Sequence, residues 1–198
     1  VQGDLRRVKR VVKYMVETSN FVVKFPFQNR PKEMLGQADS DWAGEPATRK
    51  STSSGVIFHG AHPLESWSVN QQVIALSSGE AEFYSVGKCL AHMLFLLYLL
   101  REINHTLKLR LVTDSSAAKS IASRRGLGKV RHIDVRELWI QERVQRGDFE
   151  LIKVRGEDNI ADILTKHVPR DVLDKHLKGI GCERRSGRHS LSPSVVDR

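Results

Sequence analysis

Cysteine is scarce in this chain, with only Cys89 and Cys182 among 198 residues. Two cysteines are too few for a disulfide framework, so we expect a reducing compartment. Long apolar runs are also missing. The most apolar stretch, residues 90–100, is shorter than the roughly 20 residues that span a bilayer, and it indicates a buried amphipathic helix instead.

The first fifteen residues, "VQGDLRRVKRVVKYM", contain neither an initiating Met nor the apolar segment of a secretory signal. We therefore expect a fragment of a longer protein.

Acidic residues are the minority charge, 23 against 32 basic residues, which gives a net charge of +9 and a pI near 9.8. Such a surface favours a polyanionic partner, with nucleic acid first and an acidic membrane second, although a merely soluble basic protein remains an alternative.

The apolar pattern predicts an α/β protein with one main domain. Helices are expected over 4–17, 78–102, 115–123, 135–146, from about 159, and over 171–178; strands are expected over 21–27, 34–41, 55–60, 64–69, 107–114 and 149–156. Three strands in a meander, followed by strands that alternate with helices, predict a mixed sheet covered by helices. The tail from residue 183 has little to bury, and we expect it to be disordered.

Four carboxylates lie at positions where a functional site could form, and each also has a purely structural explanation. Asp39 shares one face of a strand with Asp41, or both belong to a solvated strand end. Glu82 lies on the core side of the helix start, where acidic residues also suit the helix dipole. Asp114 ends a strand and could simply cap the next helix. Asp162 opens a late helix, again a favourable dipole position.

Several stretches together resemble the ribonuclease H domain of copia-type LTR retrotransposon polyproteins. They are "ADSDWAG", "TRKSTSSGVIF", "SWSVNQQVIALSSGEAEF", "TDSSAAKSIA", "VRHIDVRELWIQE" and "EDNIADILTKHV", spread over roughly residues 35–168. The opening stretch also resembles the segment that joins the reverse transcriptase to the ribonuclease H of that family. The resemblance implies a ribonuclease H-like fold with a mixed five-stranded sheet, made of a three-stranded antiparallel meander plus parallel strands and covered by helices.

For the site, the resemblance implies that Asp39, Glu82, Asp114 and Asp162 are the catalytic, metal-binding carboxylates, with Asp41 in a supporting role. The implied cofactor is Mg²⁺, as two ions that Mn²⁺ can replace, because hard divalent cations prefer oxygen ligands. No Cys or His is needed to bind them. His59 and His62 are read as a solvated pair in a hairpin turn and not as metal ligands.

The implied substrate is the RNA strand of an RNA–DNA hybrid, cut during reverse transcription. The expected contacts to the nucleic acid come from the basic loop after the 115–123 helix, and the residues are Arg124, Arg125, Lys129, Arg131 and His132. Two departures from the family pattern stand out. The loop "VRGEDN" lacks the histidine that cellular ribonucleases H carry before the last aspartate, and residues 69–72 are not basic.

The implied domain organisation is the end of a reverse transcriptase connection over 1–33, a ribonuclease H domain over 34–168, a helical extension over 169–182 and a disordered basic tail over 183–198. The implied partners are the hybrid and the reverse transcriptase domain of the same polyprotein, with no membrane. The implied location is cytoplasmic, within retrotransposon particles, with the nucleus as an alternative. Two other functions remain open: a catalytically inactive hybrid-binding or connecting domain, and a DNA-directed nuclease or integrase of the same broad fold.

Overall fold

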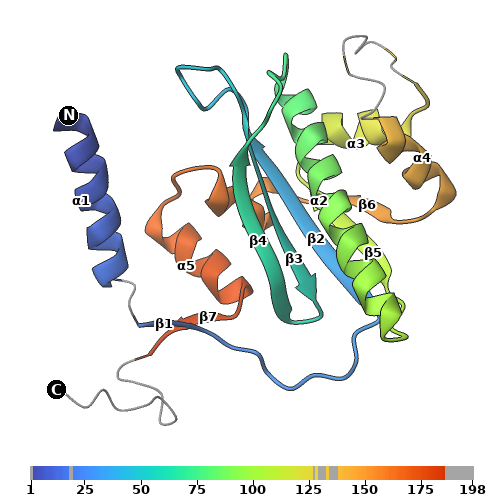
Figure 1. Cartoon of the computed structure of the whole chain (residues 1–198), viewed down its shortest axis with the longest axis horizontal. Helices are drawn as coiled ribbons and strands as arrows, with labels where there is room; N and C mark the ends of the chain where they lie inside the picture. The colour runs from blue at the N-terminus through green and yellow to red at the C-terminus, as the bar shows by residue number, and fades with distance from the viewer. Residues whose placement is uncertain (1, 18–19, 127, 129–132, 134–137, 186–198) are drawn as a thin grey trace.

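A mixed five-stranded sheet forms the centre of the protein (Figure 1). The structure, a computed structural model, describes residues 2–17, 20–126, 128, 133 and 138–185. The strands lie in the order β4-β3-β2-β5-β6. Their bounds are β2 Glu33–Asp41, β3 Thr52–His59, β4 His62–Asn70, β5 Lys108–Thr113 and β6 Glu150–Lys153.

The sheet combines two kinds of pairing. Strands β2, β3 and β4 form an antiparallel meander, whereas β5 runs parallel to β2 and β6 runs parallel to β5. Parallel neighbours need crossover connections, and helices supply them here. This arrangement confirms the fold class that the sequence predicts, including the three-stranded meander and the parallel strands.

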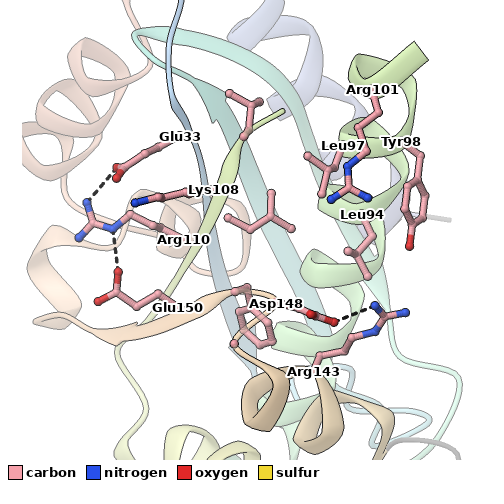
Figure 2. Close-up of a pocket in the computed structure, with 14 residues that line it drawn as sticks. Glu33, Leu94, Leu97, Tyr98, Arg101, Lys108, Arg110, Arg143, Asp148 and Glu150 are labelled. Atoms are coloured by element: carbon pink, nitrogen blue, oxygen red, sulfur yellow. Dashed lines mark hydrogen bonds and ion pairs between the residues drawn. The ribbon is translucent and has the colours of Figure 1, made fainter. Parts of the chain in front are cut away.

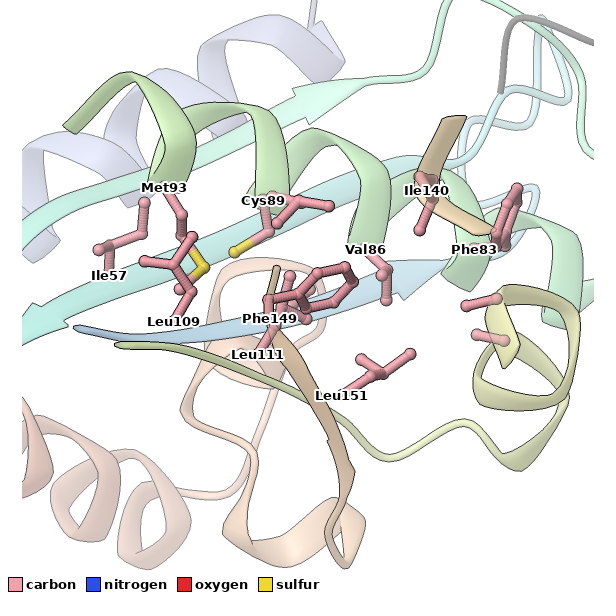
Figure 3. Close-up of a cluster of buried hydrophobic side chains, with 14 of the residues drawn as sticks. Ile57, Phe83, Val86, Cys89, Met93, Leu109, Leu111, Ile140, Phe149 and Leu151 are labelled. Carbon is pink, nitrogen blue, oxygen red and sulfur yellow. The ribbon is translucent and has the colours of Figure 1, made fainter. Parts of the chain in front are cut away.

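Helix α2 (Ser78–Glu102) crosses one face of the sheet and supplies much of the core (Figure 3). It begins where predicted, because the Ser77 hydroxyl accepts a hydrogen bond from the amide of Glu80. By length and composition alone α2 could cross a membrane, but Phe83, Val86 and Leu90 are fully buried in the core cluster. Helices α3 (Ser116–Ser123) and α4 (Trp139–Arg146) lie beside it (Figure 1).

A separate two-stranded sheet pairs a segment near the N-terminus with the end of the described chain. Strand β1 (Phe21–Val23) pairs antiparallel with β7 (Cys182–Arg184), which follows helix α5 (Arg170–Gly179). The prediction of a disordered tail from residue 183 is therefore wrong at its start. Lys24 binds Glu183 at 2.5 Å, and the Arg184 guanidinium lies over the Phe21 ring, so partners from the N-terminal segment order these residues. The rest of the tail, 186–198, lies outside the described residues.

Helix α1 (Gln2–Glu17) stands apart from the sheet in Figure 1.

A second difference from the sequence prediction concerns the helix expected from about residue 159. Residues Gly156–Asp158 and Ile160–Leu164 form two short 3₁₀ helices, η2 and η3, and not one longer α-helix. The reason is that the segment is fastened to β2: the Asn159 side chain donates to the Ala38 carbonyl, and the Ile160 amide donates to the Gln37 side chain.

The histidines near the β3–β4 turn are not simply solvated. His59 Nε2 lies 2.9 Å from His105 Nε2, and Arg30 Nε donates to His105 Nδ1 at 2.8 Å. His62 is hydrogen-bonded to the Gln28 side chain and to the Pro26 carbonyl. These contacts tie the segment before β2 to two turns of the core, so the histidines have a structural role.

The close approach of α2 to β2 generates a stability prediction. A Cβ on Gly36 would lie 2.9 Å from Cys89 Sγ and would also meet Met93 Sδ. We expect Gly36→Ala to lower the free energy of unfolding by about 1–3 kcal/mol, because an overpacked core must shift side chains. Urea denaturation measures it. Gly3→Ala in α1, where a Cβ meets nothing within 4 Å, is the control and should not destabilise. Equal effects would contradict the packing argument.

Candidate metal centre

Three of the four expected carboxylates meet at the end of the sheet. Oxygens of Asp39, Glu82 and Asp114 all lie within 4.8 Å of one another. Asp39 comes from the central strand β2, Glu82 from the first turns of α2, and Asp114 directly follows β5. Asp39 is completely buried, Glu82 is 9% exposed and Asp114 is half-buried. The chain therefore brings three carboxyl groups into one place, and two of them are buried.

Strand alternation decides which way β2 presents its side chains. Gly36 faces α2, whereas Gln37 faces the opposite side and bonds the amide of Ile160 in η3. Asp39 shares the side of Gln37, and its backbone is fixed from the α2 side: the Ser85 hydroxyl donates to the Asp39 carbonyl at 2.6 Å. Ser85 also donates to the Ser54 carbonyl on β3 at 3.0 Å, so one hydroxyl docks α2 onto two strands beside the site.

The sequence favours Glu82 as the acid at the start of α2 that faces the site, and hydrogen bonds show where Glu82 and its neighbour Glu80 lie. Glu82 Oε1 accepts from the amide of Ser40 at 3.1 Å, which places its carboxylate against β2. Glu80 points elsewhere: it accepts from the Leu76 amide and from the Tyr84 hydroxyl, and so fixes the loop before the helix. Glu82, and not Glu80, therefore lies with Asp39 and Asp114 in the candidate site.

The bland alternative for Asp114 is that it caps α3. In the structure Ser115 takes that role, because its hydroxyl accepts from the Ala118 amide at 3.1 Å. Thr113 Oγ1 accepts from the Ser115 amide at 3.1 Å and helps to shape the turn after β5. The Asp114 carboxylate is thus left for the site at the carboxyl end of a parallel strand, where α/β sheets form their sites.

Asp162 is the expected carboxylate that does not join the group. It lies in η3, and its Oδ1 binds Lys166 Nζ at 2.5 Å. The same ammonium lies 3.7 Å from Asp39 Oδ1, and the Thr165 hydroxyl donates to Asp39 Oδ2. Sequence reasoning missed Thr165 and Lys166, although both belong to the "ADILTK" stretch on which the resemblance partly rests.

The electrostatics of the group fit a hard cation. Burial, together with the nearby charges of Asp39 and Asp114, raises the pKa of Glu82 to about 8. Burial also raises the pKa of Asp39 to about 6, although the Thr165 hydrogen bond and the Lys166 charge oppose this. Within the described part of the chain, Asp39 Oδ1 and Glu82 Oε2 are buried oxygens without a hydrogen-bond partner. Buried acceptors in that state are destabilising, and a divalent cation that prefers oxygen ligands would satisfy both.

The other predicted site residues are more scattered. Asp41 is not part of the group; its carboxylate packs against Gly44 in the turn after β2. Arg124 and Arg125 follow α3, and Arg125 Nε donates to the Gln145 side chain at 3.1 Å. Lys129, Arg131 and His132 lie outside the described residues, so their predicted contacts to nucleic acid stay predictions.

A cavity of about 730 Å³ lies at the other end of the parallel strands, where β5 and β6 begin (Figure 2). Its acids are already paired: Glu33 and Glu150 with Arg110, and Asp148 with Arg143. The acidic group is at the opposite, carboxyl end of β5. The cavity is therefore not part of the candidate metal centre.

Sequence comparison connects the chain to mobile elements. It is 32% identical over 160 residues, 79% of the chain, to the retrovirus-related Pol polyprotein from transposon TNT 1-94 of Nicotiana tabacum. It is 28% identical over 186 residues, 92% of the chain, to that from transposon RE1 of Arabidopsis thaliana. The chain is a relative of transposon Pol polyproteins. It spans only 12–13% of the length of these two relatives. No family model matches the chain.

Among solved structures, the N-terminal RNase H domain of a Mycobacterium tuberculosis protein, fused to maltose-binding protein, has a TM-score of 0.47 and 19% identity. The match covers 74% of this chain and 96% of that one. LC11-RNase H1 in complex with an RNA/DNA hybrid has a TM-score of 0.46 and 17% identity, over 73% of this chain and 99% of that one. The predicted relationship to Pol polyproteins is confirmed by the sequence matches.

The raised pKa values generate a prediction for the metal-free protein. Because Asp39 and Glu82 bind protons more tightly folded than unfolded, the folded state holds more protons between about pH 4 and pH 8. The free energy of unfolding contributed by these groups should therefore fall as the pH rises through this range. In EDTA we expect the melting temperature to drop by about 2–5 °C between pH 5.5 and pH 8.5, measured by circular dichroism.

Two variants and one addition test the cause of that drop. Glu82→Gln should remove its upper part, near pH 8, whereas Glu102→Gln, at an exposed position of the same helix, should keep it. Mg²⁺ should raise the melting temperature at pH 8.5 and have less effect at pH 5.5, where protons on Asp39 and Glu82 compete with the metal. A melting temperature that rises with pH in EDTA would contradict the assignment of buried, repelling carboxylates.

Proposed function

We propose that the chain is a metal-dependent ribonuclease H domain of a copia-type LTR retrotransposon polyprotein, which hydrolyses the RNA strand of RNA–DNA hybrids during reverse transcription. The observation that carries the proposal is the group of Asp39, Glu82 and Asp114, in which two buried carboxylate oxygens have no hydrogen-bond partner among the described residues. The relationship to retrovirus-related Pol polyproteins from transposons supports the proposal.

The proposed cofactor is Mg²⁺, as two ions that Mn²⁺ can replace. Asp39, Glu82 and Asp114 would hold the metal, and Asp162 is the proposed fourth ligand. Bound divalent metal would supply an activated water and charge neutralisation at the departing 3′ oxygen. The chain's own part is to place the carboxylates before substrate arrives: Ser40 orients Glu82, Ser85 fixes the Asp39 backbone, and Ser115 takes over the capping of α3.

The proposed substrate surface is the basic stretch after α3. Arg124 and Arg125 are its described members, and Lys129, Arg131 and His132 are proposed to continue it. Contacts of this kind go to the phosphate backbone, so binding should be largely independent of sequence and should weaken with salt. One solved neighbour is an RNase H1 in complex with an RNA/DNA hybrid. We further propose that a reverse transcriptase domain of the same polyprotein is the partner, in the cytoplasm within retrotransposon particles.

Cleavage of a labelled RNA strand paired with DNA tests the proposal. With Mg²⁺ at low salt we expect cuts in the RNA strand, and none in EDTA. Asp114→Asn should reduce cleavage by at least about a hundredfold, the scale on which groups that stabilise developing charge act. Its melting temperature without metal should be unchanged or higher, because the substitution relieves repulsion. Asp171→Asn, at an exposed position in α5, is the matched control and should cleave normally.

Three outcomes separate the functions. Metal-dependent cuts that vanish in Asp114→Asn establish the nuclease and its site together. Binding of the hybrid without cutting contradicts activity in this chain and favours the inactive hybrid-binding domain, which the chain fused to its polymerase partner would test next. Cleavage of duplex DNA in preference to the hybrid would instead favour the DNA-directed nuclease.

A further inference from the structure

The ammonium group of Lys166 stands at the edge of the acidic group. Its Nζ lies 2.5 Å from Asp162 Oδ1 and 3.7 Å from Asp39 Oδ1. The lysine side chain is 44% exposed, whereas Asp39 is fully buried and the Asp162 side chain is 21% exposed. Lys166 therefore reaches inward from solvent, with its charge facing the two carboxylates on this side of the site.

The position of Lys166 is built into the fold. It lies four residues after Asp162, and its amide donates to the Asp162 carbonyl at 3.1 Å. The preceding Thr165 donates its hydroxyl to the same carbonyl and to Asp39. Further up the segment, the Ser54 hydroxyl donates to the Ala161 carbonyl at 2.8 Å, which fixes η3 to strand β3. These hydrogen bonds fix the backbone at Lys166, so its side chain starts from a defined position beside the acidic group.

If a metal ion bound here, Asp39 Oδ1 would face two cations, the metal ion and the Lys166 ammonium. Asp39 Oδ1 faces Lys166 at 3.7 Å, and it is also one of the two buried carboxylate oxygens without a hydrogen-bond partner that fit a metal ion. Two positive charges within a few ångströms of one carboxylate oxygen repel strongly where burial weakens screening. Asp162 meanwhile is bound to the ammonium and stays outside the group of three. In the present arrangement the four expected carboxylates therefore do not form one group.

We propose that Lys166 is an internal counter-cation of the metal-free site, which holds Asp162 outside the acidic group and must move away when a divalent metal binds. The inference rests on the proposed function, because it assumes metal binding at Asp39, Glu82 and Asp114. Lys166 is in these terms a positioning residue: it stabilises the metal-free site and lowers the affinity for metal. A metal ion would therefore bind only if it is attracted to the carboxylates more strongly than the Lys166 ammonium is.

Isothermal titration of the full chain with Mn²⁺, and separately with Mg²⁺, at pH 8 and low salt measures the effect. We expect Lys166→Gln to bind metal about five- to tenfold more tightly than the unmodified protein, the usual scale of coupling between two exclusive ligands. Lys166→Arg keeps the charge and should stay near the unmodified affinity. Lys24→Gln is the matched control, because Lys24 makes an ion pair of the same 2.5 Å length in the β1–β7 layer, and it should change nothing.

A second readout needs no metal. In EDTA at pH 8, Lys166→Gln should melt about 2–4 °C lower than the unmodified protein, because the carboxylates lose their counter-charge. Metal affinity that is unchanged or weaker in Lys166→Gln would overturn the inference while leaving the proposed metal centre intact. Absence of metal binding in the unmodified protein and in Lys166→Gln alike would overturn the proposed function, and the inference with it.

Discussion

The repulsion among three carboxylates at the end of one sheet is the constraint on which this structure depends. Asp39, Glu82 and Asp114 come from a strand, a helix and a turn that are distant in sequence, and nothing local would bring them together. Their meeting requires that α2 dock onto β2 and β3 in one register, and the Ser85 hydroxyl, within hydrogen-bond distance of the Asp39 and Ser54 carbonyls, supplies that docking beside Asp39. The core cluster beneath α2 supplies the apolar burial that opposes the repulsion.

A structural role alone does not explain such a site. Buried carboxylates with raised pKa values and unpartnered oxygens destabilise the fold at neutral pH, and an apolar residue in the place of Asp39 would avoid this. Functional sites are where such local destabilisation is found. The lysine and the threonine that follow Asp162 reduce the repulsion from one side only, since both contact Asp39 and neither contacts Glu82 in the described contacts. The site remains one that a divalent cation would stabilise.

Much of the fold follows from sequence because its signals are local. The apolar pattern predicts the strands of the meander and a helix from residue 78, which is where α2 begins. The ordering of residues 182–184 could not be predicted, because their pairing partner lies some 160 residues earlier, in β1. The 3₁₀ conformation of η3 likewise arises from hydrogen bonds to Gln37 and Ala38, which propensity does not include. The same holds for His59, whose partner His105 is brought near by the sheet.

The candidate site shows the same division. The sequence indicates which carboxylates matter, and three of the four meet as expected. It does not reveal that Asp162 is bound by Lys166, because an i to i+4 pair of opposite charge normally indicates only a solvated helix face. The position of that pair against Asp39 is a product of tertiary packing. The motifs thus indicate which carboxylates belong to the candidate site, whereas tertiary packing determines that Asp162 is bound by Lys166 instead of joining the other three.

A crystal of the chain, grown or soaked with Mn²⁺, would show whether the acidic group binds a metal ion. An anomalous difference map should show Mn²⁺ bonded to oxygens of Asp39, Glu82 and Asp114, with the Lys166 ammonium displaced from Asp39. A fully occupied Mn²⁺ at another place, with the three carboxylates left as they are here, would contradict the account.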